Sequence, residues 1–571
     1  MGVYYDLGRP VIGGWLGGPW FSHDPIRQCD LIWGGEFGQE GSVLFAVDVD
    51  SGAIVEEHAI GAREFGVTVE PTTGRLWLHT YHGLHQPGHL LLSWRPETRT
   101  VQSHGFPPLS GHRFVGAVLG QDGRLYLGTH PFGHLVSFDP VAEQWRDHGC
   151  QAPAPIVPGQ QIWCTLQAVT ATGEIICTIA RTRPGQTIAF DPNTGQSRLL
   201  TEVPSTPSPG NTGITRTVTA DIYAGVYTVN GETRRFHYSP RIATDIVGLN
   251  KGPDGKIYGS TIISMHLFCF DPQHRTLKDL GRVGFGNGEV YDVIAHQNKL
   301  YLGSYTGAYW AVYDPAQPWN PRPEVQGMAA DANPRCFGQL GHQMNRPFEY
   351  VVGPDGCIYI ACRADYGVPG GGLARFDPQT EAITVFRDED QSVQSIAADD
   401  RFVYGGTSVS GGRGSLESTT QGKLFVFAPE SGQRICTCIP VAEAKAVTSL
   451  AVSPVTKLVY GATDSGHLFA YDRDERQVVQ QWQLRSKGTP LMGVPETYGI
   501  IHLTTGSDGA IYGVTNCDLF KLDISTDQIS YLDPPPIRDL YQIVEGAPGF
   551  FYIGARGHLL EYHLKDTPHY R

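Results

Sequence analysis

The segment IVGLNKGPDGKIYGSTIISMHLFCFDPQHRTLKDLG (246–281) decides the fold, because its pattern recurs along most of the chain. An alternating apolar strand leads into an Asp-Gly turn and an Ile/Leu-Tyr-x-Gly-Ser/Thr strand. A variable loop follows, then a strand that ends in Phe-Asp-Pro, a turn and a last strand. Each copy therefore supplies about four short strands of period two, joined by tight turns. Further copies are VGAVLGQDGRLYLGTHPFGHLVSFDPVAEQWRDHG (115–149), VVGPDGCIYIACRADYGVPGGGLARFDPQTEAITVF (351–386) and LAVSPVTKLVYGATDSGHLFAYDRDERQVV (450–479).

This repeat predicts an all-β protein, because no stretch carries a convincing helical period. A four-stranded unit of about 40 to 45 residues is the length of one β-propeller blade. Counting the Phe/Tyr-Asp corners and two degenerate units gives about twelve blades, whereas four to eight are usual in one ring. We therefore expect two tandem β-propellers, over residues 1–320 and 321–571, in preference to one large ring.

The Pro-rich segment AQPWNPRPEVQGMAADANPRC (316–336) lacks strand alternation. We expect it to be the boundary between the propellers; the alternative is a long functional loop. A second break in the pattern is TEVPSTPSPGNTG (201–213). The N-terminal VYYDLGRP (3–10) resembles the outer-strand segment LKDLGRV (277–283). We expect it to complete the last blade, which would close that ring and remove an exposed strand edge.

Composition restricts the function. The chain has 571 residues, 18% charged side chains and a formal net charge of −14, so a nucleic-acid partner is disfavoured. No apolar run is long enough for a membrane-spanning helix, and MGVYYDLGRP lacks the pattern of a signal peptide. The eleven cysteines are scattered and odd in number. We expect a soluble, cytoplasmic protein without a membrane partner, and the oligomeric state stays open.

Candidate site residues gather at one end of the predicted blades. The loops after Tyr-x-Gly-Thr vary in length, and they share an end with the segments that enter each first strand. Arginine there would hold a carboxylate, and histidine or tyrosine would move protons. The competing interpretation is that these side chains only fill and rigidify the channel. The catalytic candidates are His82, His112, Arg113, Arg346, Glu349 and Tyr350; the substrate-binding candidates are Arg63, Glu64, His130, Glu289, Tyr291 and Arg413.

Histidines concentrate in two neighbouring repeats. His82 and His85 share one loop, and His130 lies in the corresponding loop of the next repeat, so these three are candidate metal ligands. A divalent metal fits this set, but nothing in the sequence makes one obligatory. In contrast, one group of histidines recurs just before a Leu of the repeat and is expected to be structural: His89, His134, His467 and His558.

The repeats quoted above resemble the blades of WD40/YVTN-type propellers. Their general look is similar to propeller lyases that act on polysaccharides, oligosaccharides or related compounds, such as oligogalacturonate lyase, virginiamycin B lyase and rhamnosyl-glucuronate lyases. This resemblance implies β-elimination beside a carboxylate or ester, with His or Tyr as base and Arg or a divalent metal holding the acid. The chain departs from these enzymes in its greater length and in having no visible secretion signal.

We therefore predict an enzyme that acts on a small acidic or carbohydrate-like substrate, with a lyase-type elimination or a related cyclising reaction favoured. The alternative is a non-catalytic scaffold for protein–protein interaction, which would present an exposed apolar patch. A quinone-dependent redox propeller ranks last, because the ten tryptophans follow no blade period.

Overall fold

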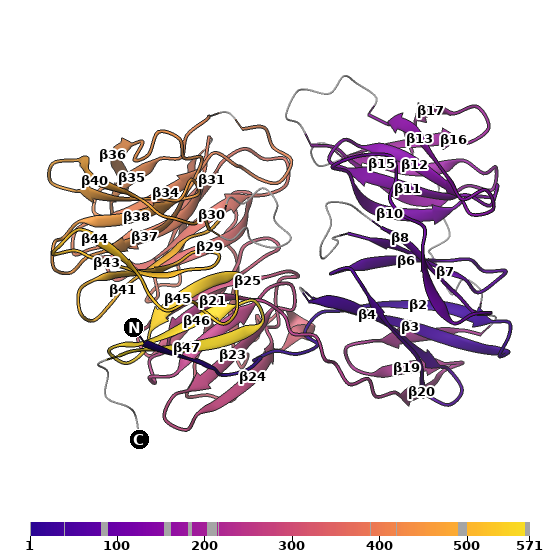
Figure 1. Ribbon diagram of the computed structural model, residues 1–571, viewed down its shortest axis with the longest axis horizontal. Coiled ribbons are helices and arrows are strands. Elements are labelled where there is room, and N and C mark those ends of the chain that lie inside the picture. The colour runs from indigo at the N-terminus through magenta and orange to yellow at the C-terminus, as the bar shows by residue number, and fades with distance from the viewer. Residues whose placement is uncertain are drawn as a thin grey trace. The chain divides into compact units, whose positions relative to one another are not determined.

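The protein is described by a computed structural model that covers residues 2–38, 40–81, 90–152, 161–180, 185–202, 214, 216–388, 390–417, 419–488 and 499–565. Within these ranges the chain forms 47 strands and one short 3₁₀ turn, η1 (Pro323–Val325). The strands make eleven four-stranded sheets and one three-stranded sheet (Figure 1). The prediction of an all-β protein built from about twelve blades is confirmed. None of the helices in the described ranges is long and apolar enough to cross a membrane.

The chain divides into two compact units that are nested in the sequence. Unit 1 comprises Met1–Gly14 and Ala243–Arg571, and unit 2 comprises Trp15–Ile242. Unit 2 is thus inserted into the sequence of unit 1, whereas we expected one propeller to follow the other. The boundary moves accordingly from residue 320 to residue 242.

The Pro-rich segment around residue 320 is a connection inside one sheet. It joins β27 to β28, and these two strands pair directly. Asn320 and Asn333 exchange two backbone hydrogen bonds of 2.7 Å within it. The Asn333 side chain also donates to the carbonyl groups of Asp314, Gln317 and Pro318. These bonds fold the segment back on itself, so it continues a blade where its composition indicated a linker.

Unit 1 contains seven sheets, each built from strands consecutive in the chain except where β1 joins the last one. The first four sheets consist of β21 (Ile246–Lys251), β22 (Ile257–Thr261), β23 (His266–Asp271) and β24 (Thr276–Arg282); β25 (Val290–His296), β26 (Lys299–Ser304), β27 (Tyr309–Tyr313) and β28 (Arg335–Gln339); β29 (Met344–Val352), β30 (Ile358–Ala364), β31 (Gly371–Phe376) and β32 (Ile383–Asp388); β33 (Ser392–Ala398), β34 (Val403–Ser408), β35 (Leu424–Ala428) and β36 (Gln433–Cys438). The last three consist of β37 (Val447–Val452), β38 (Val459–Thr463), β39 (His467–Asp472) and β40 (Gln477–Gln483); β41 (His502–Thr505), β42 (Ile511–Val514), β43 (Leu519–Asp523) and β44 (Gln528–Tyr531); β45 (Leu540–Glu545), β46 (Phe550–Ala555), β47 (His558–Leu564) and β1 (Gly2–Asp6).

The seven sheets of unit 1 close into a ring. The first strand of each sheet contacts the first strand of the next, from β21 through β25, β29, β33, β37 and β41 to β45, and β45 contacts β21. Unit 1 is therefore a seven-bladed β-propeller. Because these seven sheets close among themselves, the twelve sheets do not form one large ring.

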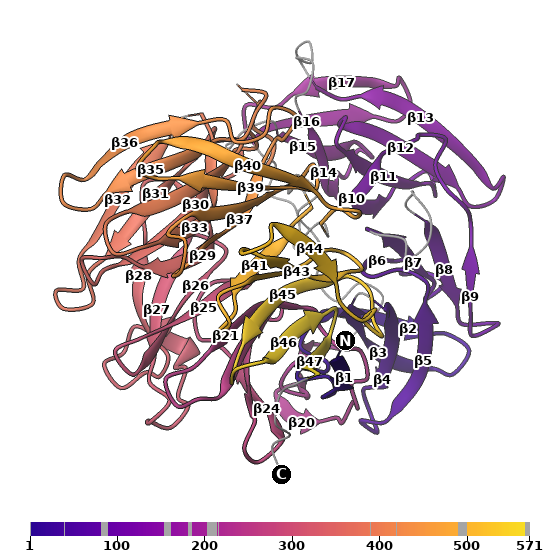
Figure 2. The ribbon, with the colours of Figure 1, turned by 60° about the vertical axis from the view of Figure 1, so that its left-hand side comes forward.

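The N-terminal strand closes the last blade, as predicted. β1 pairs antiparallel with β47 over all five of its residues, and the two strands run side by side in Figure 2. The His558 Nδ1 atom lies 3.0 Å from an Asp6 carboxylate oxygen. His266 and Asp279 make the same contact at 2.9 Å within a continuous blade. The resemblance between the N-terminal segment and 277–283 thus reflects an equivalent place in the blade.

Unit 2 has five sheets, whose first strands contact in the order β18, β2, β6, β10 and β14. They consist of β2 (Leu16–Asp24), β3 (Cys29–Gly38), β4 (Gly41–Asp48) and β5 (Ile54–Ile60); β6 (Phe65–Val69), β7 (Leu76–Thr80), β8 (Leu91–Arg95) and β9 (Thr100–Ser103); β10 (Arg113–Leu119), β11 (Leu125–His130), β12 (His134–Asp139) and β13 (Gln144–Cys150); β14 (Trp163–Val169), β15 (Ile175–Ala180), β16 (Gln186–Asp191) and β17 (Gln196–Leu199); and β18 (Val218–Asp221), β19 (Val226–Val229) and β20 (Glu232–Arg235).

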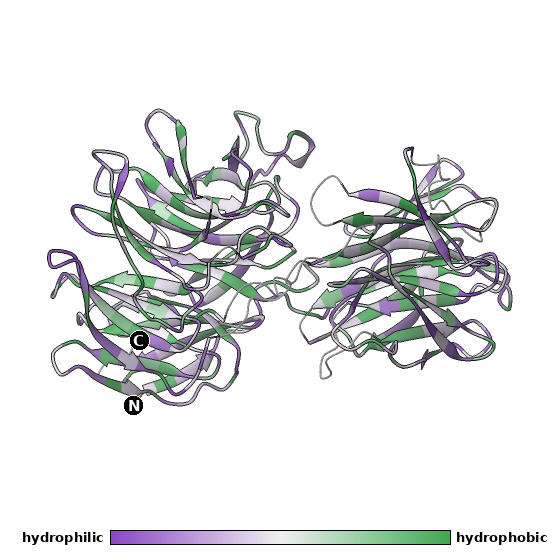
Figure 3. Cartoon of the chain, turned by 90° about the horizontal axis from the view of Figure 1, so that it is seen from above, coloured by the Kyte–Doolittle hydropathy of each residue, from purple (hydrophilic) through white to green (hydrophobic). Residues whose placement is uncertain are grey.

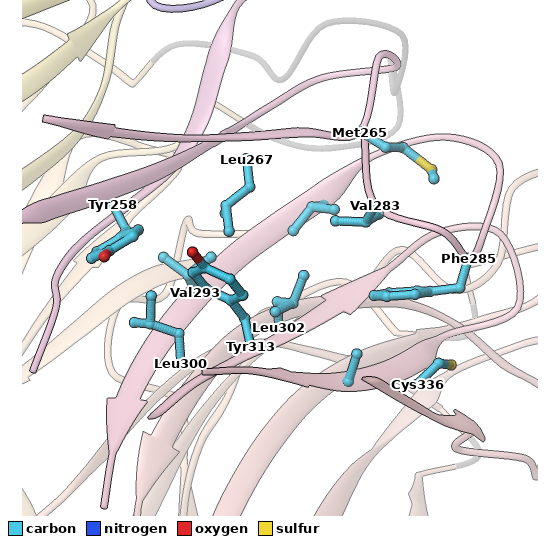
Figure 4. Close-up of a cluster of buried hydrophobic side chains, with 12 residues drawn as sticks. Tyr258, Met265, Leu267, Val283, Phe285, Val293, Leu300, Leu302, Tyr313 and Cys336 are labelled. Atoms are coloured by element: carbon cyan, nitrogen blue, oxygen red, sulfur yellow. The ribbon is translucent and has the colours of Figure 1, made fainter. Parts of the chain in front are cut away.

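The hydrophobic core lies between neighbouring blades. In one such cluster Tyr258 and Leu267 of one blade pack on Val293, Leu302 and Tyr313 of the next (Figure 4). Figure 3 shows hydrophobic residues recurring along the strands of both units. Because a blade is buried on both faces, its middle strands read as nearly continuous apolar runs.

Removing β1 should destabilise unit 1. A chain lacking residues 2–6 loses the β1–β47 ladder and the packing of Tyr4 on Tyr562, whose ring centroids are 4.6 Å apart. It also exposes the edge of β47. We expect its thermal unfolding midpoint to fall by several degrees and its tendency to aggregate to rise. Val3→Thr is the matched control, because the Val3 side chain on the same strand is exposed; equal stability of the truncated and full chains would contradict ring closure by β1.

Candidate functional site

The strongest candidate site in unit 1 is a buried arginine enclosed by tyrosines. Arg346 lies on β29 and is 2% exposed. Its Nε atom donates to the Tyr291 hydroxyl at 2.9 Å, and its guanidinium carbon lies 4.0 Å from the ring centroid of Tyr305. The Nη2 atom is 3.5 Å from the Tyr366 hydroxyl. The aromatic rings and hydroxyl groups thus replace much of the hydration that a buried cation loses.

The repeat places these side chains at one end of the propeller. Arg346 and Tyr291 lie near the start of first strands. Tyr305 directly follows the second strand β26, and Tyr366 comes two residues after the end of the second strand β30. In an antiparallel blade the entry to the first strand and the exit from the second strand meet at the same end. The Tyr305 backbone N–H donates to the Glu289 carbonyl at 2.8 Å, which fixes its position.

The loop that carries Tyr366 is held by its own polar contacts. An Asp365 carboxylate oxygen accepts from the Tyr366 backbone N–H at 2.7 Å and from the Asn345 side chain at 2.9 Å. The Gly367 N–H donates to the Arg413 carbonyl at 2.8 Å, so the loop around Arg413 in the next blade supports it. Tyr366 is therefore presented by a fixed loop and is only partly buried.

Tyr305 and Tyr366 form a hydrogen-bonded pair whose hydroxyl oxygens are 2.6 Å apart. Burial opposes ionisation of Tyr366, but the charge of Arg346, the hydrogen bond with Tyr305 and the charge of Arg413 outweigh it, so its pKa lies below the usual value. Burial raises the pKa of Tyr305. The pKa values of the two phenols are therefore shifted in opposite directions, which is the kind of separation that acid–base catalysis uses.

Glu289 adds a buried carboxyl to this group. It is 4% exposed, and burial raises its pKa against the opposing charges of Arg346 and Arg413. Its Oε2 atom and the Nη1 atom of Arg346 are buried without a hydrogen-bond partner among the described residues. Because buried polar atoms are normally paired, a bound polar ligand would improve the hydrogen bonding of both.

An axial cavity of about 30 Å³ is lined by residues of all seven blades of unit 1. This volume suits about two water molecules, since about 10–15 Å³ of such volume holds one. Glu349 lines this cavity, and its Oε1 atom lies 3.9 Å from the Nε2 atom of His502. Its full lining is Val247, Tyr291, Phe348, Glu349, Gln394, Thr448, Ile500, Tyr541 and Gln542.

Burial disfavours the charged forms of the ionisable groups near the axis. Burial lowers the pKa of His502 to about 4 and raises the pKa of Asp292 to about 8. Burial, and then the neighbouring Asp292, raise the pKa of Glu349 well above its usual range. The guanidinium charge of the site thus lies at the Arg346 cluster, whereas burial opposes charge at the polar groups near the axis.

Some of the predicted residues converge on Arg346. Glu289 and Tyr291 lie at this cluster, and Arg413 acts on it through its charge. Glu349 lines the axial cavity instead. The Tyr350 hydroxyl is within 3.2 Å of the Gly303 and Pro347 carbonyl oxygens and accepts from the Gly303 N–H at 3.1 Å, so it joins two blades and is not placed for catalysis.

The remaining predicted residues belong to unit 2. The residues concerned all lie between Trp15 and Ile242, within unit 2: His112, Arg113, His130, Arg63 and Glu64. The His112 Nδ1 atom is 3.0 Å from the Thr129 hydroxyl, and burial, with the nearby His134, lowers its pKa to about 4. Burial raises the pKa of Glu64 to about 7.

The predicted metal set is only partly visible. His82 and His85 lie outside the described residues, as does His89. The His130 Nε2 atom is 2.9 Å from the Gln161 amide oxygen, and its ring stacks on Trp163 with centroids 4.2 Å apart. Within the ranges that the structure describes, no group of three or more His, Cys, Asp or Glu is placed to hold a metal ion.

Five polar residues of this region were not predicted from the sequence. The signal for the two tyrosines among them was weak but present, because Tyr305 follows the Leu-Gly-Ser of its repeat and Tyr366 lies in the variable loop RADYGVPGGG (363–372). The axial residues occupy ordinary first-strand positions, so no motif distinguishes them. The five residues are Asp292, Tyr305, Tyr366, Gln394 and His502.

Comparison with known proteins gives a likeness of fold only. No protein-family model matches the chain, and no curated protein matches it. One similar solved structure is selenomethionine-substituted virginiamycin B lyase from Staphylococcus aureus, with 10% sequence identity, a TM-score of 0.43, and coverage of 56% of this chain and 95% of that chain. A catalytically inactive variant of that enzyme with quinupristin gives a TM-score of 0.42 at the same identity and coverage.

Titration should reveal the low pKa of Tyr366. In an ultraviolet titration of phenolate absorbance we expect one tyrosine to ionise below the ordinary range near pH 10. Tyr366→Phe should abolish this step, and Tyr305→Phe should move it upward because the hydrogen bond that favours the phenolate is lost. Tyr404→Phe is the control, since burial raises the pKa of that tyrosine. An unchanged low step in Tyr366→Phe would refute the assignment.

Asp292 should make unit 1 less stable at high pH. Its pKa rises to about 8 in the folded chain, from about 3.9 when unfolded. The folded state therefore binds the extra proton, so the free energy of unfolding falls as pH rises through this interval. Asp292→Asn should remove this loss of stability. The thermal midpoint of the variant should therefore exceed that of the wild type by a margin that grows from about pH 5 to about pH 8, roughly the interval between the unfolded and folded pKa values. The control Asp527→Asn, in an exposed turn, should have the same thermal midpoint as the wild type at each pH. A difference between Asp292→Asn and the wild type that does not change with pH would contradict the raised pKa.

Proposed function

We propose that this chain is a propeller lyase that removes a proton beside the carboxylate of a small acidic substrate at the Arg346 cluster of unit 1. The observation that carries the proposal is the Tyr305–Tyr366 pair next to Arg346, in which one hydroxyl ionises more readily than an ordinary phenol. The cluster also lies where the variable loops of neighbouring blades meet, which is where propellers usually carry their sites.

The residues divide the reaction between them. Arg346 and Arg413 attract the substrate carboxylate and stabilise the negative charge that develops when the α-proton leaves. The Tyr366 phenolate takes that proton, the C–H electron pair becomes the new C=C bond, and the β-substituent leaves with its bonding pair. Tyr305 or Glu289 supplies the proton that the leaving oxygen needs, because burial raises the pKa values of both and so favours their protonated forms.

The proposed substrate class is a sugar acid or a similar small hydroxy acid. Tyr305 and Tyr366 each offer an apolar ring face with a hydroxyl at its edge, which suits a ring that carries hydroxyl groups. Arginine recognises the planar carboxylate in a bidentate manner. We therefore propose uronates and short uronate-containing oligosaccharides as the first compounds to screen.

The test combines binding and turnover. Purified protein should show a thermal shift with uronates and should produce the ultraviolet absorbance of an unsaturated product. Tyr366→Phe should lower kcat by about 10²- to 10⁴-fold with little change in binding. Arg346→Lys should raise KM, because lysine keeps the charge but loses the fork of donors.

Controls separate this site from its competitors. Tyr404→Phe should leave turnover unchanged, because the Tyr404 hydroxyl donates to Asp399 in the β33–β34 turn and not to a residue of the cluster. Loss of activity in His112→Ala with retention in Tyr366→Phe would move the reaction to unit 2. Metal analysis of the same preparation tests the expectation of a divalent ion. Absence of a thermal shift and of turnover with every carboxylate tried would favour the scaffold alternative, to be followed by a search for a protein partner.

A further inference from the structure

A groove of about 210 Å³ lies between two neighbouring blades of unit 1. It is formed by the turn between β33 and β34, by β35 and β36, and by the turn between β39 and β40. These turns lie at the end of the blades opposite the Arg346 cluster, because they follow first and third strands and not second strands. Its lining residues are Arg401, Phe402, Val426, Ile435, Cys436, Arg473, Asp474 and Arg476.

Arg473 forms the fixed part of this groove. Its side chain is 10% exposed and contacts Asp399 and Asp400 through Nη1. Asp399 also accepts a hydrogen bond of 2.6 Å from Tyr404, so Arg473 is anchored to the β33–β34 turn. The Nε atom of Arg473 is buried and has no hydrogen-bond partner among the described residues, although an Asp474 carboxylate oxygen lies 4.0 Å away. A donor buried in this way calls for an acceptor.

The other two arginines retain most of their donors. The Nη1 atom of Arg401 lies 3.2 Å from Asp474, but these side chains are 53% and 72% exposed, so the pair is weak. Arg476 is exposed, and no carboxylate pairs with it in the part of the chain that the structure describes. Asp399 and Asp400 balance the charge of Arg473, so the available positive charge of the groove is that of Arg401 and Arg476 once Asp474 turns toward solvent.

We propose that this groove binds the phosphate monoester of a small organic molecule. The guanidinium groups of Arg401, Arg473 and Arg476 would share the phosphate oxygens, since arginine recognises phosphate with paired N–H donors. The organic part would pack on Phe402 and Ile435 at the apolar side. The groove is smaller than the roughly 300 Å³ at which pockets for drug-sized ligands begin, so the ligand is small. The site is independent of the proposed lyase chemistry.

Isothermal titration with phenyl phosphate and with inorganic phosphate tests the proposal. We expect both to bind, with phenyl phosphate binding more tightly because its ring packs on Phe402. Arg401→Ala and Arg476→Ala should each weaken binding about tenfold or more, as expected when a charged hydrogen-bonding partner is lost. Both positions are exposed, so the thermal unfolding of the ligand-free variants should stay at the wild-type value. Arg375→Ala is the matched control, because that arginine makes its ion pair, 2.9 Å from Asp355, in another blade.

The pH dependence identifies the anion. Binding of phenyl phosphate should weaken as pH falls below about 6, where a phosphate monoester loses its second charge. Phenyl sulfate, which carries one charge throughout, should bind more weakly and without this step. Absence of phenyl phosphate binding at millimolar concentration would overturn the proposal. Binding that survives in both arginine variants, or that is lost equally in Arg375→Ala, would also overturn it.

Discussion

A hydrogen bond from the repeat tyrosine to the aspartate of the preceding turn organises the blades of this protein. Tyr258 donates to Asp254 at 3.0 Å, Tyr359 to Asp355 at 3.1 Å and Tyr512 to Asp508 at 2.9 Å. The other carboxylate oxygen accepts a backbone N–H two residues on, and the glycine between them takes a positive φ, such as 79° at Gly255. One aspartate thus fixes the turn and the register of the second strand. Since a slip of one residue would turn the buried face of that strand outward, register decides the blade.

The same constraint determines where chemistry can occur. With the Asp-Gly turns fixed at one end, the entries of the first strands and the exits of the second strands must lie at the other. Few of the residues that define the repeat occur at those positions, so the side chains there can differ from blade to blade. At Arg346 this freedom is used to bury a cation among tyrosines, an arrangement whose desolvation cost is offset only where several polar groups face the charge. The burial of Glu289 beside it is also locally unfavourable, because burial raises the pKa of that carboxyl.

The repeat sequence predicted the blades and the closing strand, because both depend on local pattern: alternation, the Asp-Gly turn and the His–Asp contact repeated at His558 and Asp6. It did not predict the unit boundary. The segment around Asn333 has the composition of a linker, and its role in a blade comes from hydrogen bonds between residues that no periodic pattern connects. The site was predicted only in part, because some of its properties also depend on contacts between residues far apart in the sequence. Arg346 and Glu289 stood out by type at strand entries, whereas Tyr366 acquires its low pKa only from neighbours on other strands.

The nested order of the units is compatible with ring closure because of how the chain leaves and re-enters unit 1. Ile12 and Ala243 form an isolated antiparallel bridge, and the Thr244 N–H donates to the Val11 carbonyl at 3.2 Å. Val11 is buried in the core with Ile246 of β21. The two crossing points therefore lie side by side within unit 1, as they must for an insertion to leave its host intact. Unit 2 interrupts the sequence between the closing strand β1 and the first blade. The contacts between the two crossing points use only residues before Trp15 and after Ile242, so they do not depend on the inserted unit.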